Sequence, residues 1–105
     1  MPKVIDITNK LTNEKPRIRI SKDFEFEVNA SKNNVIKMQT IMDSDKSEVE
    51  LMDETLKLLI GEDTCNKLNE MDLSVADYKT IYTAVMACIN NESFEDAAKR
   101  FQQNR

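Results

Sequence analysis

The sequence contains no histidine and no tryptophan, and its 105 residues include one glycine, two prolines and two cysteines. Without histidine, the chain lacks the commonest general base and the commonest zinc ligand. A single glycine cannot build a glycine-rich loop around phosphate groups, which excludes the usual nucleotide-binding motifs. Scarce glycine and proline favour helices, because both residues are costly inside helices, and argue against a turn-rich sandwich or barrel.

The remaining polar residues do not form a recognisable catalytic pattern. Cys65 and Cys88 lack the Cys-x-x-Cys spacing of zinc and redox sites and have no histidine partner. Both lie in apolar helical patterns, where a free cysteine behaves as a small hydrophobe. Asp43, Asp45 and Glu48 resemble a cation site, but they lack the glycine of a calcium loop and precede an expected helix. We therefore expect no catalytic residue, no metal and no cofactor, and predict that the protein is not an enzyme.

The chain also lacks an excess of positive charge and any long apolar segment. Fifteen Lys and Arg oppose nineteen Asp and Glu, for a formal net charge of −4. This balance disfavours nucleic acid and anionic membranes as partners. No apolar run approaches the roughly 18 residues of a membrane span, and the first residues do not resemble a signal peptide. The sequence predicts a soluble, cytoplasmic, single-domain protein over residues 1–105.

The first third of the sequence predicts β structure. A short β-prone start contains Val4, Ile5 and Ile7. Two later segments alternate apolar and charged residues: Ile18 and Ile20 in the first, and Phe24, Phe26 and Val28 in the second. Such alternation is typical of strands with one buried face, and 21–23 is short enough for a hairpin turn. Arg17 and Arg19 would then face Glu25 and Glu27 across the two strands.

Beyond residue 30 the apolar spacing becomes helical. Serines followed three residues later by a polar residue mark expected helix starts at Ser31, Ser47, Ser74 and Ser93. Gly61 is a natural helix end. The clearest apolar stripe contains Tyr78, Ile81, Tyr82, Val85, Met86 and Ile89, and a shorter helix would contain Cys65, Leu68 and Met71. We predict an α+β, mainly α fold: an N-terminal β-hairpin arm (1–29) followed by four to five short helices in a compact bundle (31–103).

The number of apolar faces suggests more hydrophobic surface than one small core can hide. An unburied strand edge or apolar face invites another chain. We assign an oligomer or partner interface to Ile18, Ile20, Phe24, Phe26 and Val28 of the hairpin, and to Tyr78 and Tyr82. The two tyrosines also suit the edge of the core, and the methionines of the helical stripes suit core filling as well as adaptable contacts.

Three segments carry a resemblance to a known family: VIDITNKL near the start, RIRISKDFEFEVN in the hairpin region, and MDLSVADYKTIYTAVMACINNESFEDAAKRF in the last third. Over nearly its whole length the chain resembles tail assembly chaperones of long-tailed bacteriophages and related prophages of low-GC Gram-positive bacteria. The resemblance is one of overall pattern, without a catalytic signature.

The resemblance implies a small oligomeric protein that coats the long, helical tape measure protein before the tail tube polymerises around it. It also implies the tail tube protein as a further partner, and a longer form made by ribosomal frameshifting in many such families. A chain with a net negative charge and with apolar faces that its own core cannot bury agrees with this role. The alternative is a small regulatory or adaptor protein, antitoxin-like or a transcription-associated dimer, which would carry a basic recognition helix or a disordered arm.

Overall fold

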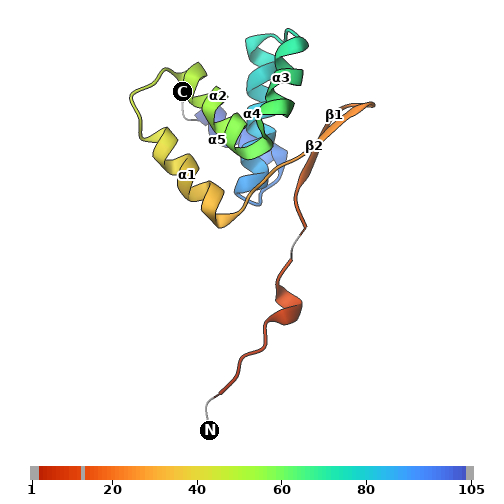
Figure 1. Cartoon of the computed structure of the whole chain (residues 1–105), viewed down its shortest axis with the longest axis vertical. Helices are drawn as coiled ribbons and strands as arrows, with labels where there is room; N and C mark the ends of the chain where they lie inside the picture. The colour runs from red at the N-terminus through yellow and green to blue at the C-terminus, as the bar shows by residue number, and fades with distance from the viewer. Residues whose placement is uncertain (1–2, 13, 104–105) are drawn as a thin grey trace.

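The structure is a computed structural model that describes residues 3–12 and 14–103, the last three by their backbone alone. Figure 1 shows a β-hairpin followed by a bundle of helices. In chain order the elements are the 3-10 helix η1 (Thr8–Lys10), strands β1 (Arg17–Ser21) and β2 (Phe24–Glu27), and helices α1 (Lys32–Met42), α2 (Glu48–Ile60), α3 (Glu62–Glu70), α4 (Val75–Ile89) and α5 (Phe94–Gln103). The predicted mainly helical α+β fold is confirmed.

The hairpin forms at the predicted place and in the predicted register. β1 and β2 are antiparallel, with Arg17 opposite Glu27 and Arg19 opposite Glu25. The Arg17 guanidinium lies 2.9 Å from a Glu27 carboxylate oxygen and 3.4 Å from one of Glu25. These side chains are largely exposed, so each pair contributes only about 0–1 kcal/mol. They instead mark the solvent face of the hairpin, opposite the face that bears the apolar residues.

Four of the helices begin at the predicted serines. Each serine hydroxyl accepts a hydrogen bond from the backbone N–H three residues later, which satisfies a donor that has no partner inside the helix. The donor–acceptor distances are 3.2 Å at Ser31, 3.3 Å at Ser47, 3.1 Å at Ser74 and 3.1 Å at Ser93. α2 ends at Gly61 with φ 92° and ψ 155°, a backbone conformation that is almost restricted to glycine.

The hairpin and the helices share one hydrophobic core. Val28, Leu56 and Val85, from the end of the hairpin, α2 and α4, have no exposed surface. Two hydrogen bonds tie the segments after the hairpin to α2: the backbone N–H of Asn29, which follows β2, donates to the Leu59 carbonyl at 2.7 Å, and the side-chain amide of Asn34 on α1 donates to the Leu58 carbonyl at 3.2 Å. The apolar face of the hairpin is therefore packed by its own chain.

Two segments differ from the local structure that the sequence predicted. Val4, Ile5 and Ile7 do not form a strand, because no other segment among the described residues pairs with them; η1 follows, with Lys10 N–H donating to the Ile7 carbonyl at 2.8 Å. Met71 lies outside the core, since α3 ends at Glu70 and the Met71 side chain is 44% exposed. Cys65 and Leu68 of the same stripe are buried.

Residues 3–12, the N-terminal arm, lead away from the body of the molecule (Figure 1). Every residue of this arm is exposed. The arm runs along the longest axis of the molecule, whose extents are 61 × 35 × 26 Å. The hydrophobic core includes the hairpin but no residue of the arm that precedes it, so packing in the core does not stabilise the arm.

Candidate interaction surfaces

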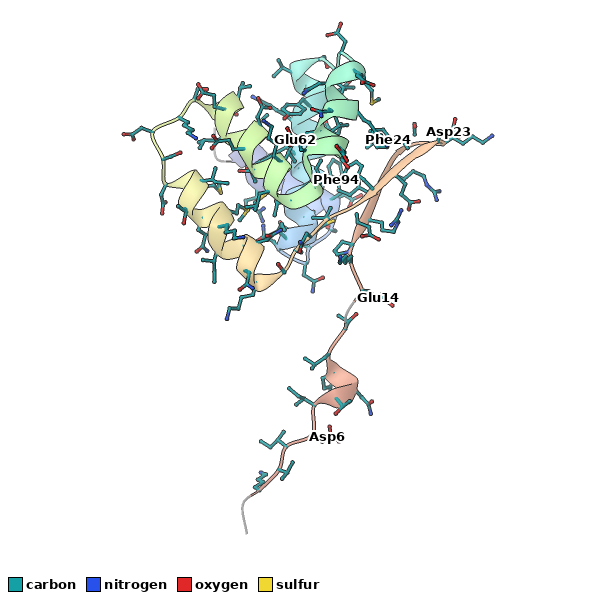
Figure 2. The ribbon with its side chains drawn as sticks, viewed as in Figure 1. Asp6, Glu14, Asp23, Phe24, Glu62 and Phe94 are labelled. Atoms are coloured by element: carbon teal, nitrogen blue, oxygen red, sulfur yellow. The ribbon has the colours of Figure 1, made fainter. Side chains whose placement is uncertain are left out.

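The predicted hairpin interface lies largely inside the molecule. Phe26 and Val28 are 5% and 0% exposed, so they face the chain's own helices and not a partner. Ile18, Ile20 and Phe24 are half-buried and pack against the same core. The Phe24 and Phe26 rings meet edge to face with their centroids 5.7 Å apart, and Figure 2 shows Phe24 near the tip of the hairpin. Only the outer part of this face remains available to another molecule.

The predicted tyrosine pair bridges two helices. Tyr78 and Tyr82 are half-buried on the side of α4 that packs near α2. The Tyr78 hydroxyl donates to the Asp53 carboxylate of α2, and burial together with this carboxylate raises the pKa of Tyr78 far above its ordinary value. Burial also raises the pKa of Tyr82. Both tyrosines are thus held by their own chain at the edge of the core.

Four aliphatic side chains of the N-terminal arm are exposed, and three of them are the most exposed large aliphatic side chains among the described residues. Their exposed fractions are 86% for Val4, 72% for Ile5, 51% for Ile7 and 69% for Leu11. Figure 2 shows the segment around Asp6 well separated from the helices, with its side chains projecting away from the chain. The sequence prediction placed the first three in β structure and did not assign them to an interface. The sequence offers no additional β-prone segment to pair with them. This was the signal that their side chains would stay exposed.

A groove opens between α2, α3 and the start of α4. Its volume is about 270 Å³, and its apolar lining includes Val49, Met52, Leu73 and Val75. Val49 and Val75 are 50% and 63% exposed. The charged residues among its described lining are Asp53 and Asp72 alone, so we refer to it as the acidic groove. It is smaller than the roughly 300–1,000 Å³ of typical small-molecule sites and suits a few apolar side chains.

A second, more open groove of about 510 Å³ lies between the hairpin and the junction of α2 and α3. Arg17, Glu25 and Glu27 line one part, where they already form ion pairs with one another. Leu58 and Ile60 line another part. Because these charges compensate each other, the groove presents no strong field of one sign to a ligand.

The thiols are poorly suited to nucleophilic chemistry. Cys65 and Cys88 are free, and burial raises the pKa of both. A raised pKa keeps the thiol protonated at neutral pH, whereas reactive cysteines need the thiolate. Across residues 3–12 and 14–103, no group of three or more potential metal-ligating His, Cys, Asp or Glu side chains comes together. In the same part of the chain, no helix combines the length and apolar character needed to cross a bilayer.

Comparisons of the chain with models of known protein families, with curated proteins and with solved structures found no match. No family is assigned to the chain. The chain presents three surfaces to a partner: a projecting aliphatic arm, a partly covered hairpin and an acidic groove.

Proposed function

We propose that the protein is a non-catalytic, self-associating escort of another protein, namely a phage tail assembly chaperone that binds the tape measure protein in the host cytoplasm. The observation that carries the proposal is the N-terminal arm, whose four aliphatic side chains are largely exposed. Single exposed hydrophobic residues are ordinary, but several on one projecting segment mark an interaction site. The resemblance of the sequence to tail assembly chaperones supplies the identity of the partner.

The physical role follows from combining apolar contact with negative charge. An aggregation-prone helical rod is kept in solution when its apolar surface is covered by molecules whose outer faces are charged. This chain has a formal charge of −4, and charged side chains make up 32% of it. Several copies on one rod would repel other coated rods while each contributes apolar contacts. The tail tube protein is a second partner in this proposal, recruited once the rod is coated.

Co-expression with the tape measure protein tests the proposal. We expect the protein to co-purify with it and to raise its soluble fraction severalfold. Replacing the arm residues in the double variant Ile5→Asp/Ile7→Asp should reduce both effects, because copies that associate less well with one another coat the rod less completely. Ile36→Asp on α1 is the matched control, because Ile36 is 52% exposed but lies outside the arm and should behave as wild type. Failure of the wild-type protein to bind or solubilise the tape measure protein would overturn the proposal.

A small regulatory or adaptor protein is the second candidate, because an extended arm is a feature expected of that class. Its acidic charge opposes binding to nucleic acid, where affinity comes mainly from lysine and arginine. A DNA mobility-shift assay at low salt separates the two candidates. A specific shift would favour the regulator, and no shift would favour the chaperone.

A further inference from the structure

We infer that the N-terminal arm of one copy of this chain seats in the acidic groove of a second copy, and that the contact repeats head to tail. The inference deepens the proposed function by naming the surfaces through which the protein self-associates, and it rests on the self-association in that proposal. The tape measure protein takes no part in the contact.

The chemistry of the arm is amphipathic, with aliphatic residues bracketed by positive charge. Lys3 and Lys10 flank Val4, Ile5 and Ile7, and Asp6 is the single acidic residue between positions 3 and 12. The Asp6 carboxylate already accepts hydrogen bonds from the Thr8 N–H at 2.9 Å and the Thr8 hydroxyl at 2.5 Å. These hydrogen bonds partly satisfy its charge. The arm therefore offers two lysines and a row of aliphatic side chains to a partner.

The acidic groove complements the arm in both respects. Val49 and Val75 form an exposed apolar rim, and Met52 lies deeper, with 4% of its surface exposed. Asp72 is exposed, and the carboxylate of Asp53 holds the Tyr78 hydroxyl. Neither lysine nor arginine is present in the described lining, so its charged groups are carboxylates and none of them repels an approaching lysine. Matching of opposite charges around an apolar contact selects the partner and its orientation.

The positions of the two surfaces determine the kind of assembly. In Figure 1 the arm runs to one end of the molecule, whereas α3 and the turn into α4, beside the groove, lie at the other end. An interface between two different surfaces is heterologous, so each copy retains a free arm or a free groove after pairing. Addition of further copies then gives an open chain or a closed ring. An open chain matches an elongated partner such as a long helical rod.

Complementation between two defective full-length variants tests this arrangement. The arm variant is Ile5→Asp/Ile7→Asp, which places negative charge where the groove is negative. The groove variant is Val75→Asp, which puts charge on the rim; an aspartate in the first turn of α4 is compatible with the helix dipole. Ile36→Asp serves as the control outside both surfaces, and circular dichroism checks the fold of each variant. Sedimentation velocity over a range of protein concentrations gives the masses.

We expect wild type and Ile36→Asp to show masses that rise beyond the dimer with concentration. The arm variant and the groove variant should each remain monomeric, with the apparent Kd raised about tenfold or more. Their equimolar mixture should form a heterodimer and nothing larger. The groove variant supplies the intact arm, the arm variant supplies the intact groove, and the pair has no further intact surface to extend it. If Val75→Asp unfolds the protein, Asp72→Asn replaces it, since asparagine tolerates the φ of 51° at this position.

Three results would overturn the inference. One is a wild-type protein that stays monomeric at all concentrations, as it would if the arm seated on its own chain. Another is self-association that the groove variants leave unchanged, as expected if the arm adds to the edge of the hairpin. The last is a mixture of folded, monomeric variants that fails to form a heterodimer. None of these experiments contains the tape measure protein, so their failure is distinct from failure of the escort function.

Discussion

Tyr78 shows how one side chain both joins two helices and responds to pH. Its ring is half-buried, and its hydroxyl donates to Asp53 on α2. Burial first, and the neighbouring carboxylate second, disfavour the phenolate and raise the pKa of Tyr78. The unfolded chain releases this proton near the ordinary tyrosine pKa of about 10. Above that pH the unfolded state binds fewer protons than the folded state, so stability falls as pH rises.

We expect the Tyr78→Phe variant to lose less stability than wild type between pH 9 and pH 11.5. The variant removes the hydroxyl whose deprotonation is suppressed by folding. Burial also raises the pKa of Tyr82, so Tyr82 still contributes part of the loss of stability at alkaline pH. Urea unfolding at several pH values measures the effect. Equal slopes of unfolding free energy against pH for the two proteins would contradict this account.

Leu56 tests the position of the core. It lies on α2 with no exposed surface, among buried residues of the hairpin end, α3 and α4. Leu56→Ala should lower the free energy of unfolding by about 2–5 kcal/mol, because the substitution removes buried methyl groups and leaves a cavity. Ile36→Ala on α1 should change it by only about 0.5 kcal/mol or less, since that side chain is half exposed. Denaturant unfolding gives both values, and similar losses for the two variants would place the core elsewhere.

At the scale of elements, helix boundaries were the most predictable feature of this fold. The serine hydroxyls at Ser31, Ser47, Ser74 and Ser93 bond to N–H groups three residues away. Such contacts depend on neighbours in the sequence, so the pattern of side chains is sufficient to locate them. The hairpin was equally predictable, because alternation and the cross-strand charge pairs are local properties. The burial of its apolar face was not, because that depends on α2 and α4.

Gly61 separates α2 from α3 and offers a test of backbone strain. A Cβ added there would meet no atom within 4 Å, so space is not limiting. Its φ of 92° and ψ of 155° nonetheless lie where other residues are strained. Gly61→Ala should therefore destabilise the protein by about 1–3 kcal/mol in thermal or denaturant unfolding.

The matched control for Gly61 is Asn91→Gly. Asn91 has a φ of 51°, in the left-handed region that glycine adopts freely. We expect this substitution to change the free energy of unfolding by about 0.5 kcal/mol or less. A tolerated Gly61→Ala would mean that the junction of α2 and α3 relaxes to an ordinary backbone conformation.

At the scale of the whole molecule, the arm and the body are physically independent. All residues from 3 to 12 are exposed, and the Asp6–Thr8 and Lys10–Ile7 hydrogen bonds are local to the arm. A chain that begins at Glu14 should keep the free energy of unfolding of the full chain within about 0.5 kcal/mol. It should also lose the concentration-dependent mass of the full chain. Denaturant unfolding and sedimentation measure the two quantities on the same samples, and a large loss of stability would show that the arm packs on the body.

The candidate interface is the feature for which the sequence prediction and the structure differ most. The sequence predicted an interface on the hairpin through Ile18, Ile20, Phe24, Phe26 and Val28, and a second candidate surface on the helix that carries Tyr78 and Tyr82. Folding buries the inner part of that hairpin and leaves the aliphatic arm uncovered. Apolar patterning identifies residues that avoid water, but it does not distinguish a face covered by its own chain from one that awaits another chain.

The sequence by itself determined the features that arise from near neighbours: the serine caps, the glycine at the end of α2, the alternating hairpin and the helical stripes. Only the tertiary structure decided which apolar faces share the core, where α2, α3 and α4 leave a groove, and which aliphatic residues stay exposed. The physical reason is distance along the chain. Caps and turns are formed by atoms a few residues apart, whereas burial depends on segments that meet only after folding.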